Sequence, residues 1–134
     1  MNALQKVAWT EVIVTFAASA AALAAIPLLG ERSIWLFGLL AVAPAIYPLW
    51  IRQRGNVILR DERDYDIARR SESCGVSSAW MFFVISMIAI SMWSHPHAIP
   101  AGYVYTLIWI QFAIFIGVKG MAALLFYRGV NRAA

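Results

Sequence analysis

The sequence predicts an all-α polytopic membrane protein with four transmembrane helices, arranged as two hairpins joined by a charged cytoplasmic helical segment. Of its 134 residues, 62% are hydrophobic and only 13% are charged. A soluble domain carries about 25% charged residues, so this chain has too little polar surface to cover a globule in water. Its length is that of one domain, and we expect a single transmembrane domain over residues 1–134.

Four apolar runs are each close to the roughly 20 residues that a helix needs to cross a bilayer. They end at polar or turn-forming residues such as Gly30, Arg52 and Arg128. No clear cleavage site follows the first run, so we expect it to remain in the protein as a span. The predicted spans are residues 8–29, 33–51, 76–93 and 103–127.

The basic residues outside the spans predict the orientation. Lys and Arg collect in the cytoplasmic loops of membrane proteins. Here nine lie on one side of the predicted spans, and Arg32 alone lies on the other. This bias places both termini and the central loop in the cytoplasm. Trp and Tyr at the span ends, Tyr127 among them, are expected to anchor the chain at the membrane surfaces. The nine residues are Lys6, Arg52, Arg54, Arg60, Arg63, Arg69, Arg70, Arg128 and Arg132.

The central loop has its acids before its bases, as expected at the start of a helix. Asp61 is a suitable N-cap, and Glu62 and Asp64 fall in the first turn, where the helix dipole favours negative charge. We therefore predict a helix that begins near Asp61 and continues into the third span, with a bend at Gly75.

Two interpretations of this charged segment remain open. One is a solvated helix start that also anchors the topology, because orientation alone explains the basic residues. The other is a docking surface for a cytoplasmic protein. The interleaved acids disfavour direct binding of nucleic acid, whose phosphates need a basic patch. The candidate partner-binding residues are Arg60, Asp61, Glu62, Arg63, Asp64, Arg69 and Arg70.

The string Asp61-Glu62-Arg63-Asp64, followed at helical spacing by Ile67, resembles a family of small bacterial membrane proteins of unknown function. In that family, helical hairpins are linked by a cytoplasmic Asp-Glu-Arg motif, and some members are encoded beside small helix-turn-helix repressors. The resemblance implies the bacterial inner (plasma) membrane as the location. It also implies a regulatory or partner-binding role, and no chemistry.

Glu11, Gln111 and Lys119 are the polar candidates within the spans. An ionisable group in a membrane is a functional hypothesis by default. If the first and fourth helices pack side by side, Glu11 and Lys119 can form an ion pair. Alternatively, Glu11 lies at the membrane surface, or Lys119 finds its partner in another subunit. Gln111 lies near the face of Lys119 and can hydrogen-bond across helices. The segment around Glu11 also resembles, very locally, the first helix of small multidrug exporters. Those proteins differ in having short loops and a deeply placed glutamate.

The chain offers little for metals or catalysis. His95 and His97 in the outer loop, with Glu31 on the other outer loop, are the candidate metal ligands, but two histidines are too few for a known site. Cys74 has no histidine on its side of the membrane. We expect no enzymatic activity, no bound metal and no cofactor.

The leading functional hypothesis is therefore an accessory or regulatory membrane subunit that binds a protein partner or forms a homo-oligomer in the lipid bilayer. A small oligomeric transporter or channel is the first alternative, because of the polar groups within the spans. The second is a membrane inhibitor that sequesters a transcription regulator through the central loop.

Overall fold

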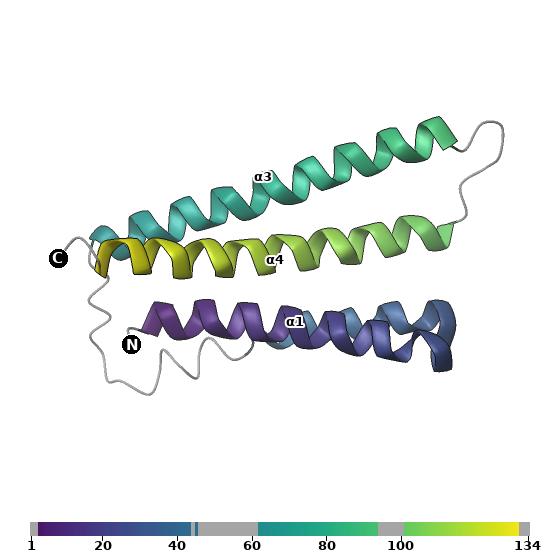
Figure 1. Cartoon of the computed structure of the whole chain (residues 1–134), viewed down its shortest axis with the longest axis horizontal. Helices are drawn as coiled ribbons and strands as arrows, with labels where there is room; N and C mark the ends of the chain where they lie inside the picture. The colour runs from purple at the N-terminus through teal and green to yellow at the C-terminus, as the bar shows by residue number, and fades with distance from the viewer. Residues whose placement is uncertain (1–2, 44, 46–61, 94–100, 132–134) are drawn as a thin grey trace.

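The computed structural model describes residues 3–43, 45, 62–93 and 101–131, which form four helices (Figure 1). Three of these helices are long and apolar enough to cross a membrane. The prediction of an all-helical fold is thus confirmed for the described residues, and the length and composition of these three helices are those of a membrane protein. The elements are α1 (Ala3–Leu29), the 3₁₀ helix η1 (Gly30–Ala41), α3 (Glu62–Trp93) and α4 (Ala101–Asn131).

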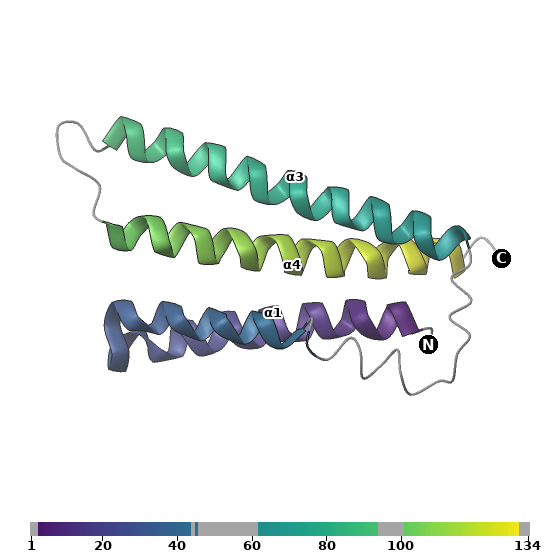
Figure 2. The same ribbon diagram turned by 180° about the vertical axis from the view of Figure 1, so that it is seen from behind.

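The first predicted span coincides with helix α1, which is long and apolar enough to cross a membrane, and the chain then turns sharply at Gly30. This residue has a φ of 55°, a left-handed conformation that glycine adopts without steric cost. From there η1 folds back along α1 (Figures 1 and 2). The second span, predicted for residues 33–51, is seen only as η1 and the helical residues that directly follow it. The rest of that prediction lies outside the described residues.

Helix α4 occupies the centre of the bundle and contacts α1, η1 and α3. One apolar cluster joins α1, η1 and α4 through Ala18, Leu40 and Ile116. A second joins α1, α3 and α4 through Ala8, Ile67 and Ala123. Because the second cluster lies near the starts of α1 and α3 and the end of α4, these three helix ends share one end of the bundle (Figure 1). We refer to it as the charged end.

The charged segment and the third span form one continuous helix of 32 residues, as predicted. Gly75, where we expected a bend, lies within this continuous helix and makes a close contact with α4. A Cβ atom at this position would lie 2.8 Å from the carbonyl oxygen of Phe115. Gly75 therefore allows α3 to approach the backbone of α4. Ser71 and Ala79, one turn away on each side, are also buried and extend this seam of small residues.

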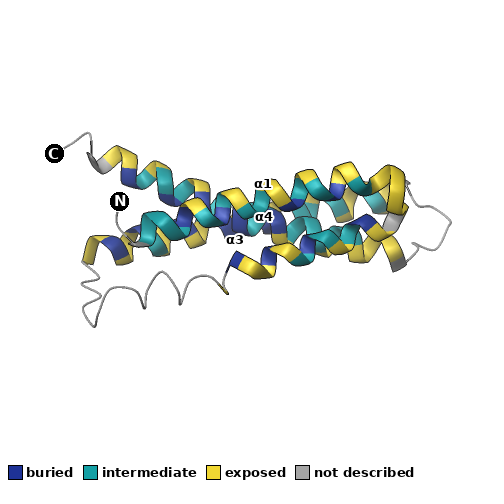
Figure 3. Cartoon of the chain, turned by 90° about the horizontal axis from the view of Figure 1, so that it is seen from below, coloured by how far each residue is buried: buried dark blue, intermediate teal, exposed yellow. Residues whose placement is uncertain are grey.

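Many large apolar residues are exposed, as expected where lipid is the solvent, and exposed positions recur along the helices (Figure 3). Exposed examples lie on all three long helices and include Phe16, Ile85 and Ile108. The buried positions are mostly small residues, which allow helices to pack closely when the hydrophobic effect does not drive them together.

Candidate functional site

The polar groups within the bundle gather around an ion pair between Glu11 of α1 and Lys119 of α4. The Lys119 Nζ donates a hydrogen bond to Glu11 Oε1 over 2.8 Å. The Glu11 side chain is 3% exposed and that of Lys119 is 28% exposed. The pair that the sequence suggested is therefore present within one chain, and the Glu11 side chain is buried inside the bundle.

Glycine residues allow the helices to meet closely at the ion pair. A Cβ atom on Gly120 would lie 3.0 Å from the carbonyl oxygen of Ala8 and 3.0 Å from the Cβ atom of Glu11. On the opposite side of α4, a Cβ atom on Gly75 would lie 3.0 Å from the Cβ atom of Lys119. The ion pair thus lies at a level where α1 and α3 both pack closely against α4.

A second polar contact, which the sequence did not predict, lies closer to the charged end. The Tyr127 hydroxyl donates a hydrogen bond to Asp64 Oδ1 over 2.9 Å, and both residues are buried. Two interpretations are corrected as a result. Tyr127 faces α3 and not the membrane surface, and Asp64 belongs to the interior and not to an exposed docking surface. The residues are far apart in the chain, so only the register of α3 and α4 brings them together.

The other candidate docking residues divide into two groups. Glu62, Arg63, Arg69 and Arg70 are exposed on α3. Arg60 lies outside the described residues, and so does Asp61, the predicted N-cap. Ser71 shares the helix but is buried, and its hydroxyl donates a hydrogen bond to the Ala68 carbonyl over 2.8 Å. The charged segment therefore has one face packed on α4 and one face open to its surroundings.

The composition of α3 indicates how deep the ion pair lies. Its charged part ends at Glu72, and residues 73–93 are apolar or small. At 1.5 Å per residue this apolar part spans about 31 Å, close to the hydrocarbon thickness of about 30 Å. Gly75, which contacts Lys119, is near the start of that part. The ion pair is therefore within about one helical turn of the hydrocarbon boundary, where a lysine costs less than at mid-membrane.

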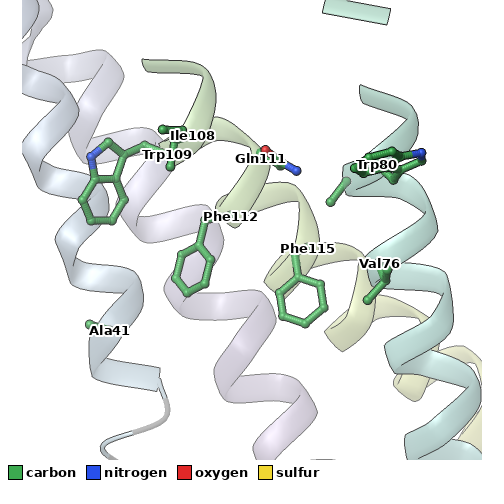
Figure 4. A pocket seen from close by; sticks show the side chains of 9 residues that line it. Ala41, Val76, Trp80, Ile108, Trp109, Gln111, Phe112 and Phe115 are labelled. Carbon is green, nitrogen blue, oxygen red and sulfur yellow. The ribbon is translucent and has the colours of Figure 1, made fainter. Parts of the chain in front are cut away.

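An apolar groove opens beside the same helices, between α3 and η1 and above α4 (Figure 4). Its volume is about 620 Å³, within the range of small-molecule sites. Gln111 is the polar residue in its lining, and its side chain lies at the wall of the groove. Among the described residues, no hydrogen bond from Gln111 to another helix is seen. The lining residues are Ala41, Val76, Ala79, Trp80, Ile108, Trp109, Gln111, Phe112 and Phe115.

The candidate metal ligands His95 and His97 lie outside the described residues. Within the described ranges, no three His, Cys, Asp or Glu side chains are grouped closely enough to hold a metal ion. Cys74 is a partly buried thiol and not part of a disulfide. The ion pair can hold α1 and α4 together, and the hydrogen bond between Tyr127 and Asp64 can hold α4 and α3 together. The exposed charges of α3 remain accessible beside them.

No family model, characterised protein or solved structure matches this chain. The resemblance to the small bacterial proteins with an Asp-Glu-Arg motif stays a prediction. The functional argument therefore depends on the geometry alone.

Proposed function

We propose that this chain is an accessory or regulatory subunit of the bacterial inner membrane, which uses the charged end of its bundle to bind a partner protein in the cytoplasm. The observation that carries the proposal is the extension of α3 beyond its apolar part. Residues 62–72 span about 16 Å at 1.5 Å per residue. The proposal assigns no reaction to the chain.

The direction of the helices supports four crossings in two hairpins. Helices α1 and α3 both begin at the charged end (Figure 1). Since α1 ends at the opposite end, the chain between α1 and α3 has to return across the bundle. Helix η1 starts this return, and at about 2.0 Å per residue its 12 residues cover about 24 Å. In this topology both termini and the central segment lie on the cytoplasmic side, as the basic residues favour.

The extension has the surface of a protein interface. It is fixed to α4 by the Asp64–Tyr127 hydrogen bond and by the cluster that contains Ile67. Its open face combines charged residues with Tyr65, an exposed aromatic, and Leu125 at the same end of α4 is also exposed. Aromatic and arginine side chains are enriched at protein interfaces. A rigid surface also loses little conformational entropy on binding.

Site-specific photocrosslinking tests the proposal. A photoreactive phenylalanine analogue replaces Tyr65, which is 61% exposed, and in a second variant it replaces Ile85, which is 59% exposed in the apolar part of α3. In native membranes, position 65 should yield a discrete protein adduct of defined mass, whereas position 85 should yield lipid adducts. Equal adduct patterns at the two positions would refute a docking surface at the charged end.

Cysteine accessibility in intact cells tests the orientation independently. With Cys74 replaced by serine, a cysteine at Arg69 should be modified by a membrane-impermeant maleimide only after the cells are opened. A cysteine at the exposed Tyr103, at the opposite end, should be modified in intact cells. The reverse pattern would refute the proposed topology.

The transporter alternative needs a wet path lined by the intramembrane polar groups. In the described part of the chain, Glu11 is buried in an ion pair, and the groove beside Gln111 is otherwise apolar. These observations favour a structural role for the polar residues. Sequestration of a transcription regulator is a narrower form of the docking proposal, and the adduct at position 65 would identify it.

A further inference from the structure

The groove between α3 and η1 is lined by apolar side chains, several of them exposed, so it opens to where the hydrocarbon of a bilayer would lie. Its side chains Val76, Trp80 and Phe112 are both groove-lining and exposed. A site of this chemistry has a favourable occupant in an alkyl chain, since it offers many apolar contacts and few hydrogen-bonding groups.

A cation, Arg69, lies on the same face of α3 as two of the residues that line the groove. Arg69, Val76 and Trp80 are related by seven and eleven residues, so they share a helix face. Arg69 is exposed, and it precedes Val76 by about 10 Å along the helix axis. Its position just before residue 73 puts it at the hydrocarbon boundary, where the phosphates of a leaflet lie.

The depth of the groove corresponds to one leaflet. On α4 it extends from Ile108 to Phe115, about 10 Å along the axis. Half of the hydrocarbon core is about 15 Å thick. The groove thus reaches from near the boundary at the charged end toward the middle of the membrane.

We propose that the groove binds one phospholipid molecule of the cytoplasmic leaflet, with an acyl chain between α3 and η1 and its phosphate accepting hydrogen bonds from Arg69. The leaflet follows from the topology proposed above. Asp66 and Glu72 lie within one turn of Arg69, so their negative charges offset its positive charge and this face does not attract anionic lipids non-specifically. Selectivity comes from the combination of one guanidinium and one apolar groove, in which a phosphate and a chain are bound together.

Two matched tryptophan substitutions test the groove. Val76→Trp fills it from an exposed wall position, and Met81→Trp places the same indole side chain on α3 at a position that does not line the groove. The two native side chains are 54% and 58% exposed. The full-length protein in mild detergent is titrated with palmitoyl-oleoyl-phosphatidylglycerol and examined by native mass spectrometry. The native chain should bind one lipid, V76W should bind it at least tenfold more weakly, and M81W should stay within twofold.

A third variant tests the phosphate contact. Arg69→Gln should weaken lipid binding about threefold to tenfold, because a charge-assisted hydrogen bond is replaced by a neutral one. Equal affinities of V76W and M81W would overturn the proposal. So would a native dimer that V76W alone dissociates, since the groove would then hold a second copy. Detergent titration does not depend on orientation or on a protein partner, so its failure is distinguishable from failure of the docking proposal.

Discussion

Removal of the charge on Lys119 should destabilise the bundle through the loss of its contact with Glu11. At 2.8 Å and an effective dielectric constant of 20, the attraction between the two charges is about 6 kcal/mol before desolvation. The cost of bringing Glu11 into the bundle offsets much of this attraction. The partial exposure of Lys119 weakens it further. A hydrogen bond to a charged group has a net value of about 1.5–3 kcal/mol, so we expect a coupling free energy of about 2 kcal/mol.

A double-mutant cycle measures this coupling. The variants are Lys119→Met, Glu11→Gln and the combination, and the free energy of unfolding is obtained by titration with sodium dodecyl sulfate in mixed micelles. Arg128→Met is the matched control, because it removes an exposed cation from the same helix and should change stability by less than about 0.5 kcal/mol.

The expected result is that the double variant is less destabilised than the sum of the single variants. A coupling energy below about 0.5 kcal/mol is the level seen for independent sites. That result would refute the pair as a link between α1 and α4. The Lys119 ammonium group would then be stabilised only by reaching the polar headgroups, and not by Glu11.

Two further predictions concern the contacts of α3 with α4. Gly75→Ala should destabilise the protein by about 1–3 kcal/mol, because the new Cβ meets a backbone carbonyl oxygen of α4, whereas Gly38→Ala, with nothing within 4 Å, should be close to neutral in the same titration. Tyr127→Phe removes the donor to buried Asp64 and should cost about 1–2 kcal/mol. Tyr103→Phe, at an exposed site, should cost less than 0.5 kcal/mol, and equal effects of the two tyrosine variants would contradict an energetic role for the buried hydrogen bond.

The ion pair was predictable because each of its residues is an ionisable group inside an otherwise apolar segment. A glutamate and a lysine within apolar runs both need a partner, and few are available in this chain. Their distances from the ends of their own spans differ, at about 4.5 Å for Glu11 and about 12 Å for Lys119, but a lysine side chain can extend toward the headgroups to cover much of that difference. No feature of the sequence indicated the hydrogen bond between Tyr127 and Asp64. Asp64 has an equally good interpretation as a first-turn acid that interacts with the helix dipole.

The helices themselves were predicted with uneven success, for a physical reason. Hydropathy measures whether a segment is compatible with lipid, which is why α1, α3 and α4 were recognised by their apolar runs. It does not measure the backbone conformation of a segment. Hydropathy therefore could not predict the 3₁₀ conformation of η1. A 3₁₀ helix of this length is also unusual, since such runs seldom exceed 3–4 residues. The groove was not predictable either, because its width depends on the spacing of helices that are distant in the chain.

The seam of small residues between α3 and α4 lies directly beside the groove. Gly75 and Ala79 bring α3 against α4, and the glycines of α4 do the same for α1. One residue after Ala79 the outward face carries Trp80, and α4 carries Phe112 nearby. The Phe115 ring lies against Gly75 in the seam, whereas Trp80 and Phe112 are exposed and line the groove. Because Ala79 and Phe115 also line the groove, the seam and the groove are adjacent parts of one contact between α3 and α4.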